Sequence, residues 1–276
     1  MNPHASLPVS PAAMIQSIWS HRALIIQMTR REIVGRYKGS LLGLSWSFFN
    51  PLLMLAVYTF VFSFVFKARW GMAAEASKAD FALVLFIGLI LHALLAEVLI
   101  RAPGQVLANA NYVKKVVFPL EILTVINLGA ALFHAFISFV VLLIAMLVLT
   151  DVPQWTILLS PLTVFPMLPL VLGIGWILTS LGVYLRDIGQ FISIITTAML
   201  FLAPVFYPAT SLPAGYQFWI NLNPITIPIE ATRQVVLFGQ IPNWNALGMY
   251  TLVAIFTAWL GFYWFQKTRK GFADVL

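Results

Sequence analysis

The stretch RREIVGRYKGSLLGLSWSFFNPLLM, residues 30–54, changes character within a few residues. Five cations precede Leu41, and they are Arg22, Arg30, Arg31, Arg36 and Lys38. The next charged residue along the chain is Lys67. A basic segment that runs directly into a long apolar one indicates a chain that passes from water into lipid. We place this boundary near Gly39.

The whole chain has the composition of a membrane protein. Of its 276 residues, 61% are hydrophobic and 9% are charged, and the mean hydropathy is +0.93. A soluble domain carries about a quarter charged residues. The composition therefore predicts an all-α integral membrane protein, with one transmembrane domain over residues 1–276. The sequence has no cysteine, which excludes disulfides and thiolate metal sites.

Six stretches are long and apolar enough to predict transmembrane helices. They cover residues 41–66, 81–100, 122–150, 162–183, 191–207 and 245–265. Prolines and asparagines interrupt the apolar run 188–229. Backbone groups freed by prolines are tolerated at membrane depth only where protein or water satisfies them. We therefore assign one span to that run, followed by a short re-entrant or interfacial pair of helices over residues 208–242.

Lysine and arginine residues predict the orientation of these spans. With six spans, four of the 16 lie on one side of the membrane and the other twelve lie on the opposite side. The four are Lys67, Arg69, Lys78 and Arg233. The positive-inside rule then places both termini in the cytoplasm. The basic cluster before residue 41 orients the first span, which has no cleaved signal peptide before it.

An amphipathic helix is predicted before the first span, within residues 10–38. Ser10 followed by Pro11 is a typical N-cap with proline in the first turn. Met14, Ile15 and Ile18 then begin an apolar stripe with helical spacing. A basic amphipathic helix at a membrane boundary lies in the interface. Its role is either that of a surface anchor or that of a docking element for a partner.

The sequence offers few motifs for catalysis. It has no Gly-rich P-loop and no His-Glu-x-x-His, so neither ATP use of the P-loop kind nor a zinc site of that kind is expected. Glu97 and Arg101 have the spacing to pair on one helix. No row of carboxylates suggests a path for protons or sodium. We therefore expect a passage that takes its energy from elsewhere, and not an enzyme.

Aromatic residues are abundant, with 22 Phe, 9 Trp and 8 Tyr. Flat rings pack well on the apolar faces of sugar rings, so aromatic side chains of the first and fifth spans are candidates for lining a passage for a sugar chain. These are Phe48, Phe49, Tyr58, Phe201, Phe206 and Tyr207. Packing between helices or contact with lipid is the simpler interpretation of any single one.

Four motifs, in this order, carry a resemblance to a known family. They are YKGSLLGLSWSFFNPLLMLAVYTFVFSFVF, NANYVKKVVFPLEIL, RDI with LFLAPVFYP, and the LP and NP pairs before Arg233. Over about residues 12–270 the chain resembles the membrane subunits of type-2 ABC exporters of polysaccharides, which include permeases for O-antigen and teichoic acid. One departure is LILHALLAE around His92, where many members carry an aromatic residue.

The resemblance implies a homodimer of six-span subunits in the bacterial inner membrane. Two cytoplasmic ATPase chains would bind the ATP and Mg, so this chain would need no cofactor, and no nucleic acid is involved. The substrate would be a lipid-linked glycan such as O-antigen, moved from the inner to the outer leaflet.

The resemblance also assigns roles to residues. The diphosphate headgroup of the lipid would meet the basic cluster Arg30, Arg31, Arg36 and Lys38. The loop 102–121 would couple the permease to the ATPase through Asn109, Asn111, Tyr112, Lys114 and Lys115. The segment 208–242 would form a periplasmic gate that contains Pro213, Asn221, Asn223, Pro224 and Arg233.

Two alternatives stay open on the sequence alone. A type-2 ABC exporter of a small molecule or drug has the same six spans. A membrane-embedded transferase of lipid-linked sugars would need a carboxylate or histidine at a water-accessible depth. Asp187 and Glu121, the nearest candidates, are isolated in the sequence.

Overall fold

The computed structural model describes residues 8–61, 78–114, 118–149, 154–211 and 213–276. Within these ranges all the regular secondary structure is helical. Four helical stretches in the described part of the chain are long and apolar enough to cross a membrane, namely Phe81–Ala108, Ile122–Leu149, Trp155–Tyr184 and Trp244–Val275. The prediction of an all-α membrane protein is confirmed.

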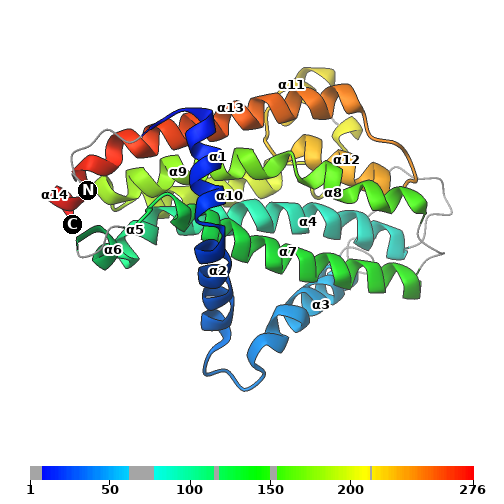
Figure 1. Ribbon diagram of the computed structural model, residues 1–276. Coiled ribbons are helices and arrows are strands. Elements are labelled where there is room, and N and C mark those ends of the chain that lie inside the picture. The colour runs from blue at the N-terminus through cyan, green and yellow to red at the C-terminus, as the bar shows by residue number, and fades with distance from the viewer. Residues whose placement is uncertain (1–7, 62–77, 115–117, 150–153, 212) are drawn as a thin grey trace.

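Four long helices run side by side and form the body of the molecule (Figure 1). They are α4 (Lys78–Arg101), α7 (Ile122–Leu149), α9 (Met167–Tyr184) and α13 (Trp244–Thr268). The predicted first and fifth spans contain the shorter helices α3 (Trp46–Thr59) and α10 (Ile188–Leu202), of 14 and 15 residues. A crossing needs roughly 20 residues, so helix length supports four crossings directly. Residues 62–66 of the predicted first span lie outside the described residues.

Helices α9 and α13 pack in close contact because both carry glycine where they meet. A Cβ atom on Gly261 would overlap the carbonyl oxygen of Gly173, and one on Gly173 would overlap the carbonyl oxygen of Thr257. Small residues let helix backbones approach closely in lipid, where the hydrophobic effect between helices is weak. Beside this contact, the fully buried Trp176 of α9 stacks edge-on against Phe262 of α13.

The basic segment before the first span forms two helices, α1 (Pro11–Ser20) and α2 (Arg22–Tyr37), with a break at His21. The Ser10 side chain accepts a hydrogen bond from the backbone N–H of Ala13 at 3.2 Å and so caps α1. Figure 1 shows α1 and α2 in blue, running across the long helices and not along them. This direction is the one expected of helices that lie in the membrane interface.

Short helices mark the two ends of the bundle. At one end lie α5 (Gln105–Ala108), α6 (Ala110–Lys114) and α14 (Phe272–Val275) (Figure 1). Toward the other end lie α8 (Ser160–Val164), α11 (Ala214–Asn221) and α12 (Thr226–Val236). Both α11 and α12 fall within the proline-rich segment 208–242, between α10 and α13.

Candidate functional site

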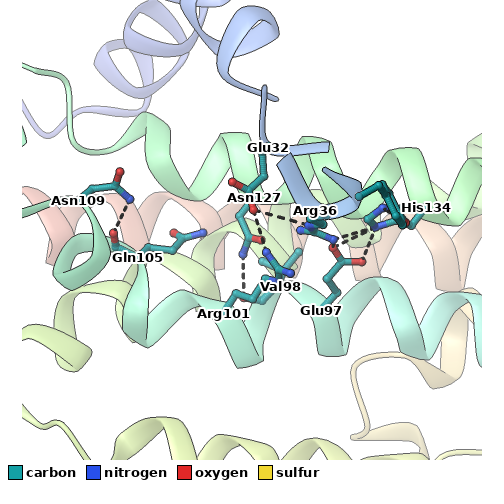
Figure 2. Close-up of polar contacts among 10 residues, drawn as sticks. Glu32, Arg36, Glu97, Val98, Arg101, Gln105, Asn109, Asn127 and His134 are labelled. Atoms are coloured by element: carbon teal, nitrogen blue, oxygen red, sulfur yellow. Dashed lines mark hydrogen bonds and ion pairs between the residues drawn. The ribbon is translucent and has the colours of Figure 1, made fainter. Parts of the chain in front are cut away.

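Polar side chains gather where α2 crosses α4 and α7 (Figure 2). Arg36 of α2 forms an ion pair and a hydrogen bond with Glu97 of α4, and its Nη1 lies 3.0 Å from Nδ1 of His134 on α7. Its Nε lies 3.6 Å from Oε1 of Glu32, one turn earlier on α2. The Arg36 side chain is only 14% exposed, so these charges meet largely out of water.

His134 completes this group, which we call the Arg36 network: Arg36, Tyr37, Glu97 and His134. The His134 ring has Nδ1 at 3.1 Å from Oε2 of Glu97 and Nε2 at 3.0 Å from the hydroxyl of Tyr37. Burial raises the pKa of the Tyr37 phenol above its usual value, so the hydroxyl keeps its proton. The His134 ring therefore lies between the carboxylate of Glu97 and the hydroxyl of Tyr37. The network joins α2 to α4 and α7.

The expected pairing of Glu97 with Arg101 along α4 is wrong. Nη1 of Arg101 donates instead to Oε1 of Glu32 at 2.8 Å, while Glu97 pairs with Arg36. The reason is that α2 lies across α4 and presents a carboxylate and a guanidinium one turn apart. Glu97 and Arg101 therefore each meet an opposite charge on the neighbouring helix. The spacing of residues within α4 could not reveal that Glu32 and Arg36 of α2 would compete for these partners.

A cavity of about 730 Å³ lies beside this crossing, between α2, the end of α4, the α5–α6 segment and the start of α7. We call it the cationic cavity, because its charged lining residues are three cations and one carboxylate, namely Arg31, Lys38, Arg101 and Glu32. Its uncharged polar lining includes Gln105, Asn109, Tyr112 and Asn127. The amide of Asn127 donates to the carbonyl of Val98 at 3.0 Å and so fixes α7 against α4 at the cavity wall.

The predicted basic cluster is therefore divided by the fold. Arg31 and Lys38 line the cationic cavity, and Arg36 is held in the Arg36 network. Arg30 is exposed and does not line the cavity. Arg101 was not among the predicted headgroup residues, because its position on a long apolar helix suggested only a local partner. Its place on the cavity wall depends on how α2 crosses α4.

The predicted coupling residues lie in the segment that continues α4 through α5 and α6. Asn109 donates from its amide to the carbonyl of Gln105 at 2.9 Å, and the Tyr112 ring stacks on Phe118 with centroids 4.4 Å apart. Asn111 is exposed. Lys115 lies outside the described residues, as does the side chain of Lys114. The segment lies against α14, close to the C-terminal residue (Figure 1).

Among the predicted gate residues, Arg233 is completely buried and binds several backbone carbonyls. Its Nε donates to the carbonyl of Val84 at 3.0 Å, and its terminal nitrogens donate to those of Pro204 at 2.5 Å and Val205 at 3.0 Å. Glu230 supplies a carboxylate at 3.2 Å from Nη1. Arg233 thus ties α12 to α4 and to the turn after α10.

The other gate residues surround the turn between α11 and α12. Asn223 donates to the carbonyl of Met199 at 3.4 Å and caps the backbone N–H of Ile225 at 3.3 Å. The carbonyl of Pro224 accepts a hydrogen bond from the hydroxyl of Tyr250 at 2.7 Å. Pro213 and Asn221 are exposed at the two ends of α11.

The predicted aromatic lining comes from α3 and from the end of α10 with the turn that follows it. Phe201 and Phe206 stack at 5.5 Å at the end of α10, and the Tyr207 hydroxyl donates to the carbonyls of Phe201 and Leu202. On α3, the partly exposed Phe49 contacts Phe48 edge-on, and Phe48 packs on the core. Tyr58 and Phe206 both pack against the cluster of Phe81, Val84 and Leu85, so they lie near one another. The order along the chain could not indicate this proximity.

Glu121 is a residue that the sequence presented as isolated, yet it joins three distant elements. Its carboxylate accepts the Ser17 hydroxyl at 2.7 Å and pairs with Arg269 at 2.9 Å. Its backbone carbonyl accepts the indole N–H of Trp176 at 2.8 Å. The residue is buried and is the last one of the predicted coupling segment 102–121. No local pattern indicates these partners, since Arg269 is 148 residues away along the chain.

Comparison with known families decides what kind of protein carries these features. The model of the family described as ABC-2 type transporter matches residues 23–237. The chain belongs to the ABC-2 type transporter family. It is therefore the multi-pass membrane permease of a transporter and not an enzyme, and it works with a separate cytoplasmic ATPase.

Several relatives of this ABC-2 permease are similar over nearly its full length. The O-antigen export system permease protein RfbA of Myxococcus xanthus is 24% identical over 263 residues, 95% of this chain and 98% of the relative. A Klebsiella pneumoniae protein of the same name is 25% identical, over 92% of this chain and 95% of the relative. The polysialic acid transport protein KpsM of Escherichia coli is 25% identical, over 82% and 87% of the two chains.

Proposed function

We propose that this permease is the transmembrane subunit of an ATP-driven exporter that moves a cell-surface polysaccharide across the bacterial inner membrane. The observation that carries the proposal is the near full-length similarity to permeases named for O-antigen export and polysialic acid transport. These relatives favour a glycan over a small molecule or drug. The absence of a P-loop in the sequence agrees with ATP hydrolysis by a partner chain.

The proposed assembly is a homodimer with two cytoplasmic ATPase subunits. Each permease has six spans, with α3 and α10 as the shorter first and fifth ones, and both termini lie in the cytoplasm. The uneven division of lysines and arginines supports this orientation. So does the position of α6 and α14 at the same end of the bundle (Figure 1). The segment 102–121 at that end contacts the ATPase through Asn109, Asn111 and Tyr112, with Lys114 and Lys115 at the membrane surface.

The proposed substrate is a glycan carried on a lipid phosphate. Its headgroup reaches the permease from the cytoplasmic leaflet at the basic residues of α2 and Lys38. Arg31 and Lys38 line the cationic cavity, Arg30 is exposed on the surface of α2, and Arg36 anchors α2. The sugar chain then passes the aromatic side chains of α3 and those at the end of α10 and in the turn after it. The helices α11 and α12 close the periplasmic side, held by Arg233 and the turn at Asn223 and Pro224.

One experiment tests the polysaccharide assignment. The gene is deleted from its host and the surface glycan is compared with that of cells that carry the gene on a plasmid. We expect loss of surface polysaccharide, accumulation of lipid-linked glycan inside, and copurification of an ATPase with the tagged permease. Unchanged surface glycan in the deletion strain would show that the cargo is something else.

A conservative substitution tests the role of the headgroup residues. Replacing Arg31 with Lys keeps the positive charge that topology requires but removes the planar fork that binds two phosphate oxygens at once. We expect normal membrane insertion and abundance together with reduced glycan export. Full export in Arg31→Lys would leave only an orienting role for this residue.

A further inference from the structure

The cationic cavity contains a carboxylate in the place that an anionic ligand would take. Glu32 accepts the Arg101 hydrogen bond at 2.8 Å and also lies 3.6 Å from Arg36. The other two cations of the cavity, Arg31 and Lys38, form no ion pair with any carboxylate in the described part of the chain. Positive charge therefore exceeds negative charge inside a recess whose walls come from four parts of the chain.

We propose that this cavity binds a phosphate or diphosphate group, and that the group displaces Glu32 from Arg101. Guanidinium groups bind phosphate oxygens in pairs with matched geometry, and a recess of one charge sign attracts the opposite sign. Arg101 exchanges one anionic partner for another, so it is never left without one. The inference rests on the proposed function and deepens it, since a lipid-linked glycan brings such a phosphate to this face of the membrane.

The walls of the cavity link a bound anion to the coupling segment. Gln105 and Asn109 line the cavity and are joined to each other, since the Asn109 amide donates to the Gln105 carbonyl at 2.9 Å. The Gln105 side chain also accepts a hydrogen bond from Thr179 of α9 at 3.3 Å. Figure 2 shows Gln105 and Asn109 to the left of Arg101, in the chain that continues α4, and Glu32 on α2 above Arg101.

These contacts give the site a regulatory role. Arg101 has two alternative partners, the Glu32 carboxylate or the bound phosphate. When the phosphate replaces Glu32, α2 loses this hydrogen bond to α4. A ligand shifts such an equilibrium by its preference for one state. Binding of the anion therefore raises ATP turnover by the partner through the coupling segment, so that ATP is hydrolysed chiefly when a substrate headgroup is present.

The test measures ATP turnover by the purified permease–ATPase complex in phosphatidylcholine nanodiscs, at saturating ATP. A polyprenyl diphosphate is titrated into the discs, and the polyprenyl alcohol without phosphate is the control lipid. We expect the diphosphate lipid to stimulate turnover and the alcohol to have no effect. Inorganic pyrophosphate in solution forms a separate arm. Stimulation by pyrophosphate equal to that by the lipid would assign the site to a soluble phosphate.

Two variants should move the half-maximal lipid concentration in opposite directions. Arg101→Gln removes a charged hydrogen bond to the ligand and should raise that concentration about tenfold. Glu32→Gln removes the competing carboxylate and should lower it several-fold. A general distortion of α2 would shift both variants the same way. Arg22→Gln is the matched control, because Arg22 lies on α2 like Glu32 but outside the cavity. This variant should respond like the wild type.

Arg31→Lys keeps the test decisive if Arg101→Gln does not fold, because Arg31 is exposed and its replacement should also weaken the response. Wild-type responses in Arg101→Gln, or in Arg31→Lys where the first variant does not fold, would overturn the inference. So would a wild-type complex that exports glycan without responding to the diphosphate lipid, and in that case the proposed function would stand. If the complex responds to the lipid but deletion of the gene leaves the surface glycan of the host unchanged, the phosphate site stands and the glycan is not the cargo.

Discussion

At the scale of single residues, Arg36 belongs to the basic cluster that orients the first span, yet it also forms a buried ion pair that stabilises the fold. It pairs with Glu97, and both side chains are largely buried. Breaking a buried pair from one side costs more than the pair contributes, since the remaining charge stays out of water without a partner. The charge rule that orients a span treats Arg30 and Arg36 alike, whereas their surroundings differ completely.

Truncating both partners should therefore cost less than the two single truncations added together. We expect Arg36→Ala to lower the free energy of unfolding by about 3 kcal/mol, because Glu97 keeps its charge. The double variant with Glu97→Ala should lose clearly less than the sum of the single losses. Unfolding of the purified permease in detergent, followed by circular dichroism, measures these differences. Arg30→Ala is the matched control and should stay within about 0.5 kcal/mol of the wild type. Additive losses at Arg36 and Glu97 would contradict the pairing.

At the scale of elements, the α9–α13 contact depends on the absence of side-chain atoms. Gly261→Ala places a methyl group against the backbone of α9 and should force the two helices apart, with a loss of about 2 kcal/mol in stability. Gly248→Ala, on the same α13, is the matched control, because a Cβ there meets no atom within 4 Å. Abundance in the membrane and thermal unfolding of both variants test the contact. Equal behaviour of the two would mean that the close approach of the helices is not needed.

The coupling segment can be tested through the ring that holds it. Tyr112 stacks on Phe118 with an interplanar angle of 14°. Tyr112→Phe keeps the ring and should retain export, whereas Tyr112→Ala removes the stacking and should lower export several-fold while the ATPase subunit still binds ATP. Export of glycan and ATP turnover in the same membranes measure the two quantities. If Tyr112→Ala exports as well as the wild type, the segment does not transmit the motion.

Some elements were predictable because their signals are local. The N-cap at Ser10 and the long apolar helices follow from residues a few positions apart, and the structure contains them. The partners of Glu97 and Glu121 were not predictable, because α2 and the C-terminal residues meet them only in the folded chain. The same reason explains the division of the basic cluster between the cavity, the network and the surface.

At the scale of the whole molecule, the orientation of the chain can be measured directly because the sequence contains no cysteine. A single cysteine at Tyr216, exposed on α11, should react with a maleimide that cannot cross the membrane when it is added to spheroplasts. A single cysteine at Lys270 should react only after the membrane is permeabilised. The wild-type chain gives the background in both cases. Reaction at both positions in intact spheroplasts would rule out a cytoplasmic C-terminus.

The two partners of the Glu121 carboxylate are synthesised at very different times. Ser17 is synthesised before Glu121, but Arg269 is synthesised 148 residues after it, and both side chains bind the same carboxylate. Until Arg269 has been synthesised, the Glu121 carboxylate can accept the Ser17 hydroxyl but lacks its cation. The contact site of α1 at Glu121 is therefore completed by a cation that follows α13 in the chain.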